Sequence, residues 1–437
     1  MFELDTGNTA FMILAASLVL LMTPALAFFY GGMVRGKSVL NMMMMSFGAL
    51  GLISVIWVIY GYSAAFGSDI GGFIGNPTDF LGLQGVADEN SLMAATGVPF
   101  LVAAGFQLTF AVITVALISG AVADRLKFNA WLVFAGVWVT LVYLPMAHMV
   151  WGGGLLGADF FLKDSLPLPI DFAGGTVVHI NAGVAGLVLA VIAGKRKGFG
   201  REPMRPHNLP FVMLGAALLW FGWFGFNAGS EFAADGTAGR AWLNTTIATA
   251  LAMLAWLATE KVRDGHATSL GAASGVVAGL VAITPAAAAV DTWGALAIGA
   301  VAGVLCALAV GLKYKFGYDD SLDVVGVHLV GGLVGTILIG LFATDKNFTF
   351  LPAVDEFSAQ PGLFYGGGAE QLVTQVVVAL AAVLFSGVVT AIIALALKAT
   401  MGLRVSEEVE VGGIDLAVHG ESAYETLGGA RVVTEVK

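Results

Sequence analysis

The chain contains 437 residues, of which 58% are apolar and 11% are charged, and its formal net charge is −10. About a quarter of the residues in a soluble globular domain are charged, so these side chains are too few to cover a water-soluble surface. The composition therefore excludes a soluble protein and predicts one that lies in a lipid bilayer.

The first apolar stretch runs from residue 9 to residue 30. Glu3 and Asp5 precede it, whereas a secretory signal begins with Lys or Arg, and the apolar run continues beyond Pro24. We therefore interpret this stretch as an uncleaved first membrane span, and a cleaved signal peptide is the alternative.

Ten further apolar stretches are each long enough to cross a hydrocarbon core of about 30 Å. They lie near residues 41–66, 98–123, 128–150, 171–194, 209–230, 241–259, 267–284, 292–311, 324–343 and 371–397. The fold class is therefore expected to be all-α integral membrane, with eleven transmembrane helices. Because eleven is odd, the two termini are expected on opposite sides of the membrane.

Charged residues orient this set of spans, because Lys and Arg are retained on the cytoplasmic side. Most of the 20 basic residues fall in one set of loops, which places the N-terminus outside and the C-terminus in the cytoplasm. Acidic residues concentrate in the outer segments, where they either attract a small cation or merely keep those loops soluble. We predict a transmembrane domain over residues 1–397 and a cytoplasmic tail over 398–437, docked on the inner face.

The fifth and tenth spans share a pattern in which an Asp precedes a His by eight residues and Gly follows the His by four and by seven. These residues are Asp171, His179, Gly183 and Gly186 in one span and Asp320, His328, Gly332 and Gly335 in the other. The two spans cross in opposite directions, so the pattern predicts an inverted repeat of five helices plus five, with the eleventh left over. Such repeats place a substrate path near the bilayer midplane.

The two histidines are expected to meet near that midplane. If each Asp marks a membrane boundary, each His lies about 12 Å deep in a core of about 30 Å. An ionisable side chain at that depth usually has a function, although hydrogen-bonded structural histidines are the alternative. A neutral pair in contact can share one proton along a narrow path. For His148, at the end of the fourth span, we favour a hydrogen bond that holds a loop.

Aromatic residues near the outer ends of three segments suggest a cation site. Phe106 and Phe110 lie one helical turn apart, as do Phe226 and Ser230, and Trp151 is expected in the loop after the fourth span. An aromatic ring contributes about 2 kcal/mol to holding a desolvated cation. Spacing alone leaves this site and ordinary packing equally open.

Longer strings resemble the ammonium transporter family of Amt and Mep proteins. They are DFAGGTVVHIN from Asp171 to Asn181, FGWFGFNAGS from Phe221 to Ser230, AHMVWGGG from Ala147 to Gly154, and FQLTFA over residues 106–111. The segment from Gly402 to Glu425 is similar to the family's cytoplasmic C-terminal region. Residues 67–97 and 350–370 match no part of the family that we can place.

The resemblance implies roles for eight residues. It places Phe106, Trp151 and Ser230 in an outer recruitment site for NH₄⁺, Phe110 and Phe226 in a stacked gate, His179 and His328 in the pore, and Asp171 in support of the outer site. It also implies a homotrimer with one pore per subunit, a multi-pass location in the cell membrane, and inhibition by a PII-type signalling protein at the cytoplasmic face.

These expectations predict that NH₄⁺ binds outside, loses its proton, and crosses as NH₃ with or without that proton, with methylammonium as an analogue. A Rhesus-type channel for neutral gases is one alternative, but that family lacks the tryptophan of the recruitment site. An ammonium sensor is another, and sensors usually carry an output domain. The sequence contains neither HExxH nor GxSxG, so we expect no enzyme, cofactor or metal site, and no nucleic-acid partner.

Overall fold

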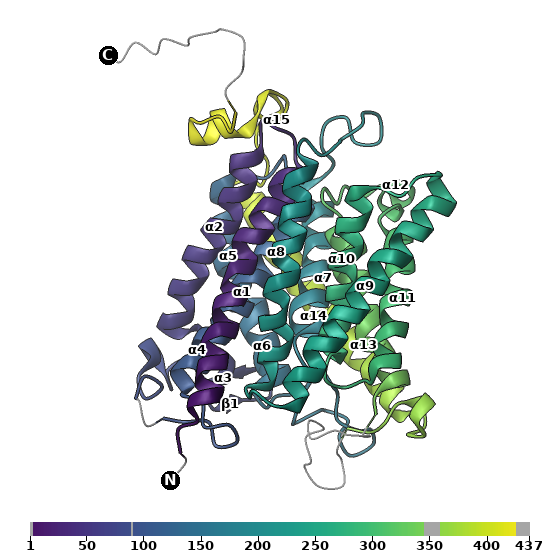
Figure 1. The fold of residues 1–437 in the computed structure, drawn as a ribbon. Coiled ribbons are helices and arrows are strands. Elements are labelled where there is room, and N and C mark those ends of the chain that lie inside the picture. Colours follow the sequence, from purple (N-terminus) through teal and green to yellow (C-terminus); the bar gives the residue numbers. More distant parts are fainter. Residues whose placement is uncertain (1–2, 89–90, 345–358, 425–437) are drawn as a thin grey trace.

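The computed structural model describes residues 3–88, 91–344 and 359–424, and these form one bundle of helices (Figure 1). Eleven helical segments in the described residues are long and apolar enough to cross a membrane. The eleven predicted spans are therefore confirmed, with ends that differ from the expected ones by a few residues. The chain is a multi-pass, all-helical membrane protein.

The helices follow one another along the chain, with long connections after α3, α6 and α13. The spans are built from α1 (Thr6–Met33), α2 (Val39–Ile56) with α3 (Tyr62–Phe66), α4 (Phe100–Ile118), α5 (Phe128–Trp138) with α6 (Leu144–Trp151), α7 (Asn181–Ala193), α8 (Leu209–Ala228), α9 (Gly236–Asp264), α10 (Ser269–Ile283), α11 (Thr292–Ala309) with α12 (Leu312–Phe316), α13 (Val330–Phe342) and α14 (Glu370–Thr400). A two-stranded antiparallel hairpin, β1 (Asp69–Ile70) and β2 (Ile74–Gly75), and the short helix α15 (Glu407–Gly412) lie outside the spans.

Four spans contain a π-helical turn. One turn joins α2 to α3 (Trp57–Gly61) and another joins α5 to α6 (Val139–Tyr143). The other two, Gly175–Ile180 and Val325–Leu329, lead directly into α7 and α13, and each carries one of the two histidines. Because π-helical turns widen a helix locally and are frequent at functional sites, they direct attention to these two spans.

Glycine allows the first and sixth spans to pack closely. A Cβ atom on Gly215 of α8 would lie 2.4 Å from the backbone nitrogen of Phe29, and one on Gly225 would lie 2.5 Å from the carbonyl oxygen of Ala15. Lipid supplies no hydrophobic force between helices, so such close backbone contact is what holds spans together. On the outside, large apolar side chains of α14 such as Leu384, which is 68% exposed, face the surroundings.

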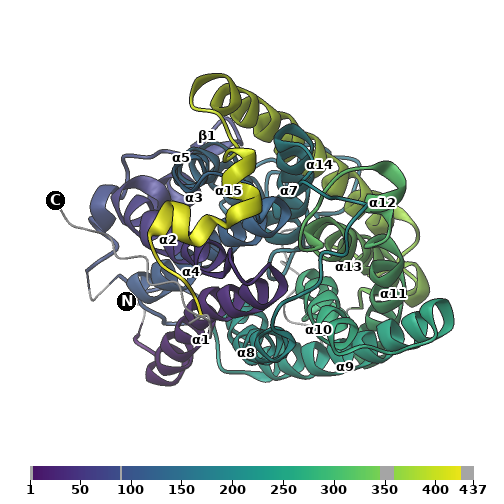
Figure 2. The same ribbon diagram turned by 90° about the horizontal axis from the view of Figure 1, so that it is seen from above.

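The two ends of the bundle differ in character. The hairpin and the beginning of α1 lie at one end, which we call the vestibule end, and α15 lies at the other, which we call the tail end (Figure 1). Seen from the tail end, the segment after α14 lies across the bundle, and its π-helical turn Asp415–His419 lies against α2 (Figure 2). The C-terminal segment after α14 is therefore docked on the bundle as predicted, up to the last described residue.

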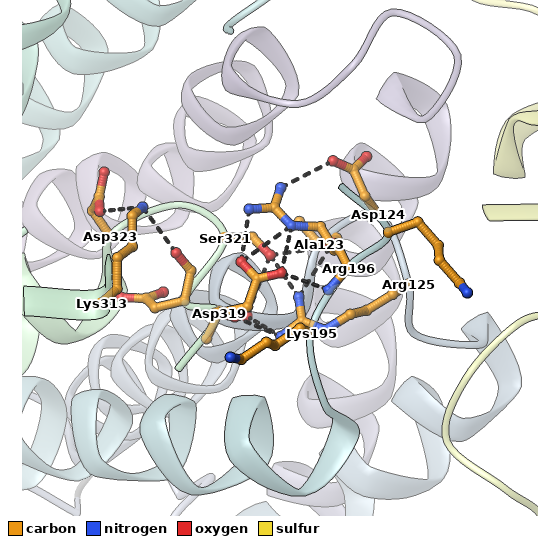
Figure 3. A network of polar contacts seen from close by, with 12 residues as sticks. Ala123, Asp124, Arg125, Lys195, Arg196, Lys313, Asp319, Ser321 and Asp323 are labelled. Carbon is orange, nitrogen blue, oxygen red and sulfur yellow. Dashed lines mark hydrogen bonds and ion pairs between the residues drawn. The ribbon is translucent and has the colours of Figure 1, made fainter. Parts of the chain in front are cut away.

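Buried ion pairs join three connections at the tail end (Figure 3). Arg196 Nη2 lies 2.8 Å from Asp319 Oδ1, and Arg196 Nη1 lies 3.3 Å from Asp124 Oδ2. Arg125 donates to Ser321 Oγ at 2.6 Å and to the backbone oxygen of Asp319 at 2.6 Å. Burial alone would raise the pKa of Asp319, but the hydrogen bonds and charge of Arg196, with the charge of Arg125, lower it below its ordinary value.

The tail is attached to this network. Arg404 forms an ion pair with Glu410 at 2.6 Å, and the backbone nitrogen of Val405 donates to the carbonyl oxygen of Arg125 at 3.0 Å. The carboxylate of Asp415 accepts from the first backbone N–H groups of α2. These contacts fix the tail end of the bundle and thereby the position of the π-helical turn that follows Asp319.

Candidate functional site

A cavity of about 810 Å³ opens at the vestibule end, and we call it the vestibule. Its wall is mostly apolar and aromatic. The described part of residues 67–97, a stretch whose sequence matched no part of the family, supplies several of the wall residues, including Phe80, Val86 and Met93. Two predicted recruitment residues, Trp151 and Ser230, also line it. This volume is many times larger than that of a small molecule such as water.

Trp151 is the last residue of α6, and the prediction that it lies in a loop was therefore wrong. The helix continues because the glycines that end it begin only at Gly152, whose backbone nitrogen still donates to the oxygen of His148 at 2.9 Å. The indole Nε1 donates to the backbone oxygen of Asp171 at 2.9 Å. This bond fixes the ring against Phe110, with ring centroids 6.0 Å apart.

Ser230 lies in the 3₁₀ turn Gly229–Glu231 that ends α8. Its hydroxyl donates to the backbone oxygen of Phe226 at 2.8 Å. Because that bond uses the only hydroxyl proton, the Oγ atom can act only as an acceptor toward a molecule in the vestibule. A cation that carries N–H groups suits such an acceptor.

Phe106 does not line the vestibule, although it was predicted with Trp151 and Ser230. Its side chain is fully buried, with its ring centroid 4.8 Å from that of Phe110 and 5.4 Å from that of Phe232. It also contacts the backbone beside Ser230, because a Cβ atom on Gly229 would lie 2.9 Å from the Phe106 ring. Phe106 therefore supports the site from behind, and a direct contact with substrate stays a prediction.

Two stacked rings separate the vestibule from a smaller inner cavity. Phe110 lines the vestibule and Phe226 lines the inner cavity. Their ring centroids lie 4.0 Å apart and their planes differ by 17°. The two residues predicted to form a gate are thus stacked between the two cavities, and their role as a gate stays a prediction.

The inner cavity contains His179 and His328 and is otherwise lined by apolar and aromatic side chains. Its free volume of about 10 Å³ corresponds to about one water molecule. An ion with a hydration shell does not fit into this space. A single molecule of about the size of water does.

The two imidazole rings are in contact, as the matched spacing predicted. His328 Nδ1 lies 3.3 Å from His179 Nδ1, and the ring centroids are 5.4 Å apart. One Nδ1 must donate and the other must accept, so in the neutral pair one Nε2 is an acceptor and the other a donor. The Nε2 atom of His179 is buried without a hydrogen-bond partner among the described residues. The pair therefore offers polar atoms to whatever enters the inner cavity.

Asp171 positions the first histidine by capping its π-helical turn. The carboxylate accepts four backbone N–H groups, from Gly174 and Gly175 at 2.9 and 2.6 Å and from Thr176 and Val177 at 2.9 and 3.2 Å. Gly174 has a φ of 109°, which side chains with a Cβ rarely adopt. Asp171 is thus a structural anchor beside the vestibule, and its backbone oxygen also holds Trp151.

Asp320 plays the corresponding part before His328. Its carboxylate accepts from the backbone nitrogens of Val324 and Val325 at 3.1 and 2.7 Å. Both carboxylates therefore precede their helical segments: the fifth span starts at 175 rather than at 171, whereas the tenth starts at 325, one residue from its predicted start. The eight residues between each Asp and its His are therefore not all helical, and the depth of about 12 Å stays a prediction, although the histidines do meet.

Glycines bring the two histidine spans together reciprocally. A Cβ atom on Gly183 would lie 2.4 Å from the backbone nitrogen of Leu329, and one on Gly332 would lie 3.0 Å from that of Ile180. Each span therefore places its glycine against the π-helical turn of the other. The likeness of the two local structures is consistent with an inverted repeat, which as a relation between whole halves stays a prediction.

Trp223 was missed by the sequence interpretation. Its ring stacks on His179 with centroids 5.4 Å apart and planes 16° apart, and its Nε1 donates to Thr284 Oγ1 at 2.8 Å. It lies one turn before Phe226 on the same face of α8, and this spacing is the signal that was available. This stacking of Trp223 holds the plane of the His179 ring.

The remaining histidines lie outside the path. His148 Nδ1 lies 3.0 Å from the backbone oxygen of Ala65, and its Nε2 lies 2.9 Å from Asp69 Oδ1, so it holds a loop as we favoured. The hydrogen bond and charge of His148 lower the pKa of Asp69. Within residues 3–88, 91–344 and 359–424, no group of three His, Cys, Asp or Glu side chains is arranged to hold a metal ion.

Comparisons with known proteins agree on one family. The family model described as Ammonium Transporter Family matches residues 10–424. The chain is 58% identical to an ammonium transporter of Mycobacterium tuberculosis, over 96% of this chain and 91% of that one. It is 51% identical to an ammonium transporter of Aquifex aeolicus, over 97% and 94% respectively.

Solved structures of similar proteins have the same fold. The crystal structure of Saccharomyces cerevisiae Mep2 superimposes with a TM-score of 0.80 at 34% identity, covering 93% of this chain and 91% of that one. A sensor Amt protein superimposes with a TM-score of 0.83 at 28% identity, covering 94% of this chain and 98% of that one.

Proposed function

Because this chain belongs to the ammonium transporter family of Amt and Mep proteins, we propose that it carries ammonium across a cell membrane. Members of this family are transporters rather than enzymes. One observation carries the proposal: an aromatic vestibule leads through two stacked rings to a narrow cavity that contains a pair of histidines in contact.

Recruitment takes place where the vestibule meets the Phe110 ring. Trp151 offers an aromatic ring fixed by its bond to Asp171, and Ser230 offers a hydroxyl oxygen that can only accept. NH₄⁺ has four N–H donors and a positive charge, so it satisfies both groups at once. Phe106 holds the Ser230 turn and the Phe110 ring in place from behind.

The ion loses its proton before it passes the gate. An isolated charge costs many kcal/mol in an apolar cavity, whereas neutral ammonia, which is hydrogen-bonded there by the histidines, costs little. The room beside His179 and His328 admits one small molecule. Potassium cannot lose its charge in this way, so the gate and the inner cavity exclude it on chemical grounds.

The fate of the proton distinguishes two versions of this mechanism. In the electrogenic version the proton crosses separately, by way of the histidine pair, and net NH₄⁺ moves. Solid-supported membrane electrophysiology on proteoliposomes separates the versions, because only electrogenic transport gives a current when ammonium is applied. Active liposomes without an ammonium-evoked current would contradict the electrogenic version and favour neutral NH₃ transport.

Uptake of labelled methylammonium into proteoliposomes tests the function itself. We expect uptake that ammonium inhibits and potassium does not, and a large loss of uptake in Trp151→Leu. Trp242→Leu is the matched control, since Trp242 is 46% exposed on the outer surface of α9. Uptake equal to that of empty liposomes would refute transport. Uptake that is unchanged in Trp151→Leu would instead favour a Rhesus-type channel for neutral gases.

A sensor that uses the same pore is the second candidate, favoured by the close superposition with a sensor Amt protein. The identity to that protein is 28%, against 58% to the mycobacterial ammonium transporter. Transport is therefore the better-supported function. A sensor would bind methylammonium without concentrating or equilibrating it across the liposome membrane.

Assembly and regulation extend the proposal. We place the vestibule end outside the cell and the tail end in the cytoplasm, as the distribution of Lys and Arg predicts. A homotrimer is expected, and native mass spectrometry of detergent-purified protein tests it. The tail end, with its docked C-terminal segment, is the expected binding face for a PII-type protein, which a binding assay with and without residues 402–437 tests.

A further inference from the structure

Glu231 places a carboxylate in the wall of the vestibule beside Ser230. It is the last residue of the 3₁₀ turn that ends α8, and it lines the vestibule together with Trp151 and Ser230. The sequence interpretation assigned it no role. An acidic side chain next to a cation site changes the electrostatics of that site more than any neutral residue does.

Other charges in this region are already compensated. The carboxylate of Asp171 accepts four backbone N–H groups, and that of Asp235 caps α9 by accepting from Thr237 and Ala238. Glu231 differs, because its buried Oε2 atom accepts no N–H or O–H group among the described residues, and its carboxyl group is instead paired with that of Asp235 through a side-chain hydrogen bond. Among the described residues, no Lys, Arg or His lines the vestibule.

The backbone holds Glu231 in this position. Phe232, which follows it, has a φ of 58°, a left-handed conformation that bulky side chains rarely adopt. The Phe232 ring packs edge-on against Phe106, with centroids 5.4 Å apart. This contact fixes the turn, in which Ser230, Glu231 and Phe232 all line the vestibule. Strained backbone that is held by packing is a common feature of ligand-binding sites.

We propose that Glu231 is a third ligand of the recruitment site and sets its affinity for small monovalent alkylammonium and ammonium ions. An N–H group of the cation donates to the Glu231 carboxylate while a second N–H group donates to Ser230 Oγ. The carboxylate also attracts cations into the vestibule from solution. This inference rests on the proposed function, since it assumes that a cation is recruited beside Ser230.

The substitution Glu231→Gln tests this role, because it removes the charge and keeps the size of the side chain. We expect the KM for methylammonium uptake to rise about tenfold at low salt, with the maximal rate changed less than about twofold. The difference in KM should shrink as ionic strength rises. Glu231→Asp keeps the charge and should restore most of the affinity.

Asp164→Asn is the matched control, since it removes one negative charge from an exposed outer residue that does not line the vestibule. An unchanged KM in Glu231→Gln, or a change equal to that in Asp164→Asn, would overturn the inference. If Ser230→Ala raises the KM and Glu231→Gln does not, only the Glu231 role fails. If the unaltered protein shows no uptake, the proposed function itself fails. Should Glu231→Gln not fold, an unaltered affinity in Glu231→Ala would overturn the role instead.

Discussion

Replacing Asp171 by Asn separates a structural role for this residue from a chemical one. The carboxylate accepts two N–H groups on each oxygen, from Gly174 and Gly175 on Oδ1 and from Thr176 and Val177 on Oδ2. An amide keeps one acceptor oxygen and turns an NH₂ group toward the other two donors. At about 2 kcal/mol for each charge-assisted bond lost, Asp171→Asn should destabilise the fold by about 4 kcal/mol.

Asp320 provides an internal comparison. Its carboxylate accepts one N–H group on each oxygen, so Asp320→Asn leaves one donor without an acceptor and should cost about 2 kcal/mol. The ion pair of Lys313 is made with Asp323, at 2.7 Å, and not with Asp320. The unfolding midpoint of detergent-purified protein, measured by intrinsic fluorescence, should therefore fall about twice as far for Asp171→Asn.

Methylammonium uptake completes this experiment. The anchoring role predicts that uptake falls together with the unfolding midpoint, because the Trp151 ring and the His179 turn both depend on Asp171. A variant Asp171→Asn that unfolds at the same temperature as the unaltered protein but has lost uptake would refute the reasoning. Asp171 would then act on the substrate or its proton.

Three further predictions follow from contacts in the structure. Thr284→Val leaves the buried Trp223 N–H without an acceptor, at a cost of about 1–3 kcal/mol, and should lower uptake several-fold. Folding lowers the pKa of Asp319, so the stability that its carboxylate contributes is complete above the ordinary carboxyl pKa of about 4 and is lost as the pH falls further. Asp319→Asn should remove this acid dependence from unfolding midpoints measured between pH 7 and pH 3. Gly335→Ala puts a Cβ atom 1.9 Å from a backbone oxygen of α10 and should abolish the monodisperse peak in size-exclusion chromatography, whereas Gly105→Ala, with open space around it, should not.

The contact between His179 and His328 was predictable because both lie in strongly apolar spans and share a spacing to an Asp and two glycines. The local structure between each Asp and its His was not predictable. Sequence periodicity does not reveal that each Asp carboxylate accepts several backbone N–H groups and caps the helical segment that follows, as Asp171 does for Gly174 to Val177. The extents of the spans were predictable for the simpler reason that lipid requires a minimum apolar length.

The vestibule was the least predictable part. The described part of residues 67–97 forms part of its wall through loop conformation, with glycines at positive φ such as Gly72 and Gly85, and no hydrophobic period marks such a segment. Trp223 escaped notice because a tryptophan in a span usually packs against neighbours or lipid. Phe106 was placed in the site by resemblance, yet it lies one layer behind the surface.

Ammonium-dependent uptake by the histidine variants tests the central claim, that the substrate passes the pair formed by His179 and His328. The measurement compares labelled methylammonium uptake by the unaltered protein, His179→Ala and the control His207→Ala, whose side chain lies at the tail end beside Val34. We expect His207→Ala to transport at the normal rate and His179→Ala to lose ammonium-competed uptake. Full, ammonium-competed uptake by a folded His179→Ala protein would contradict the account.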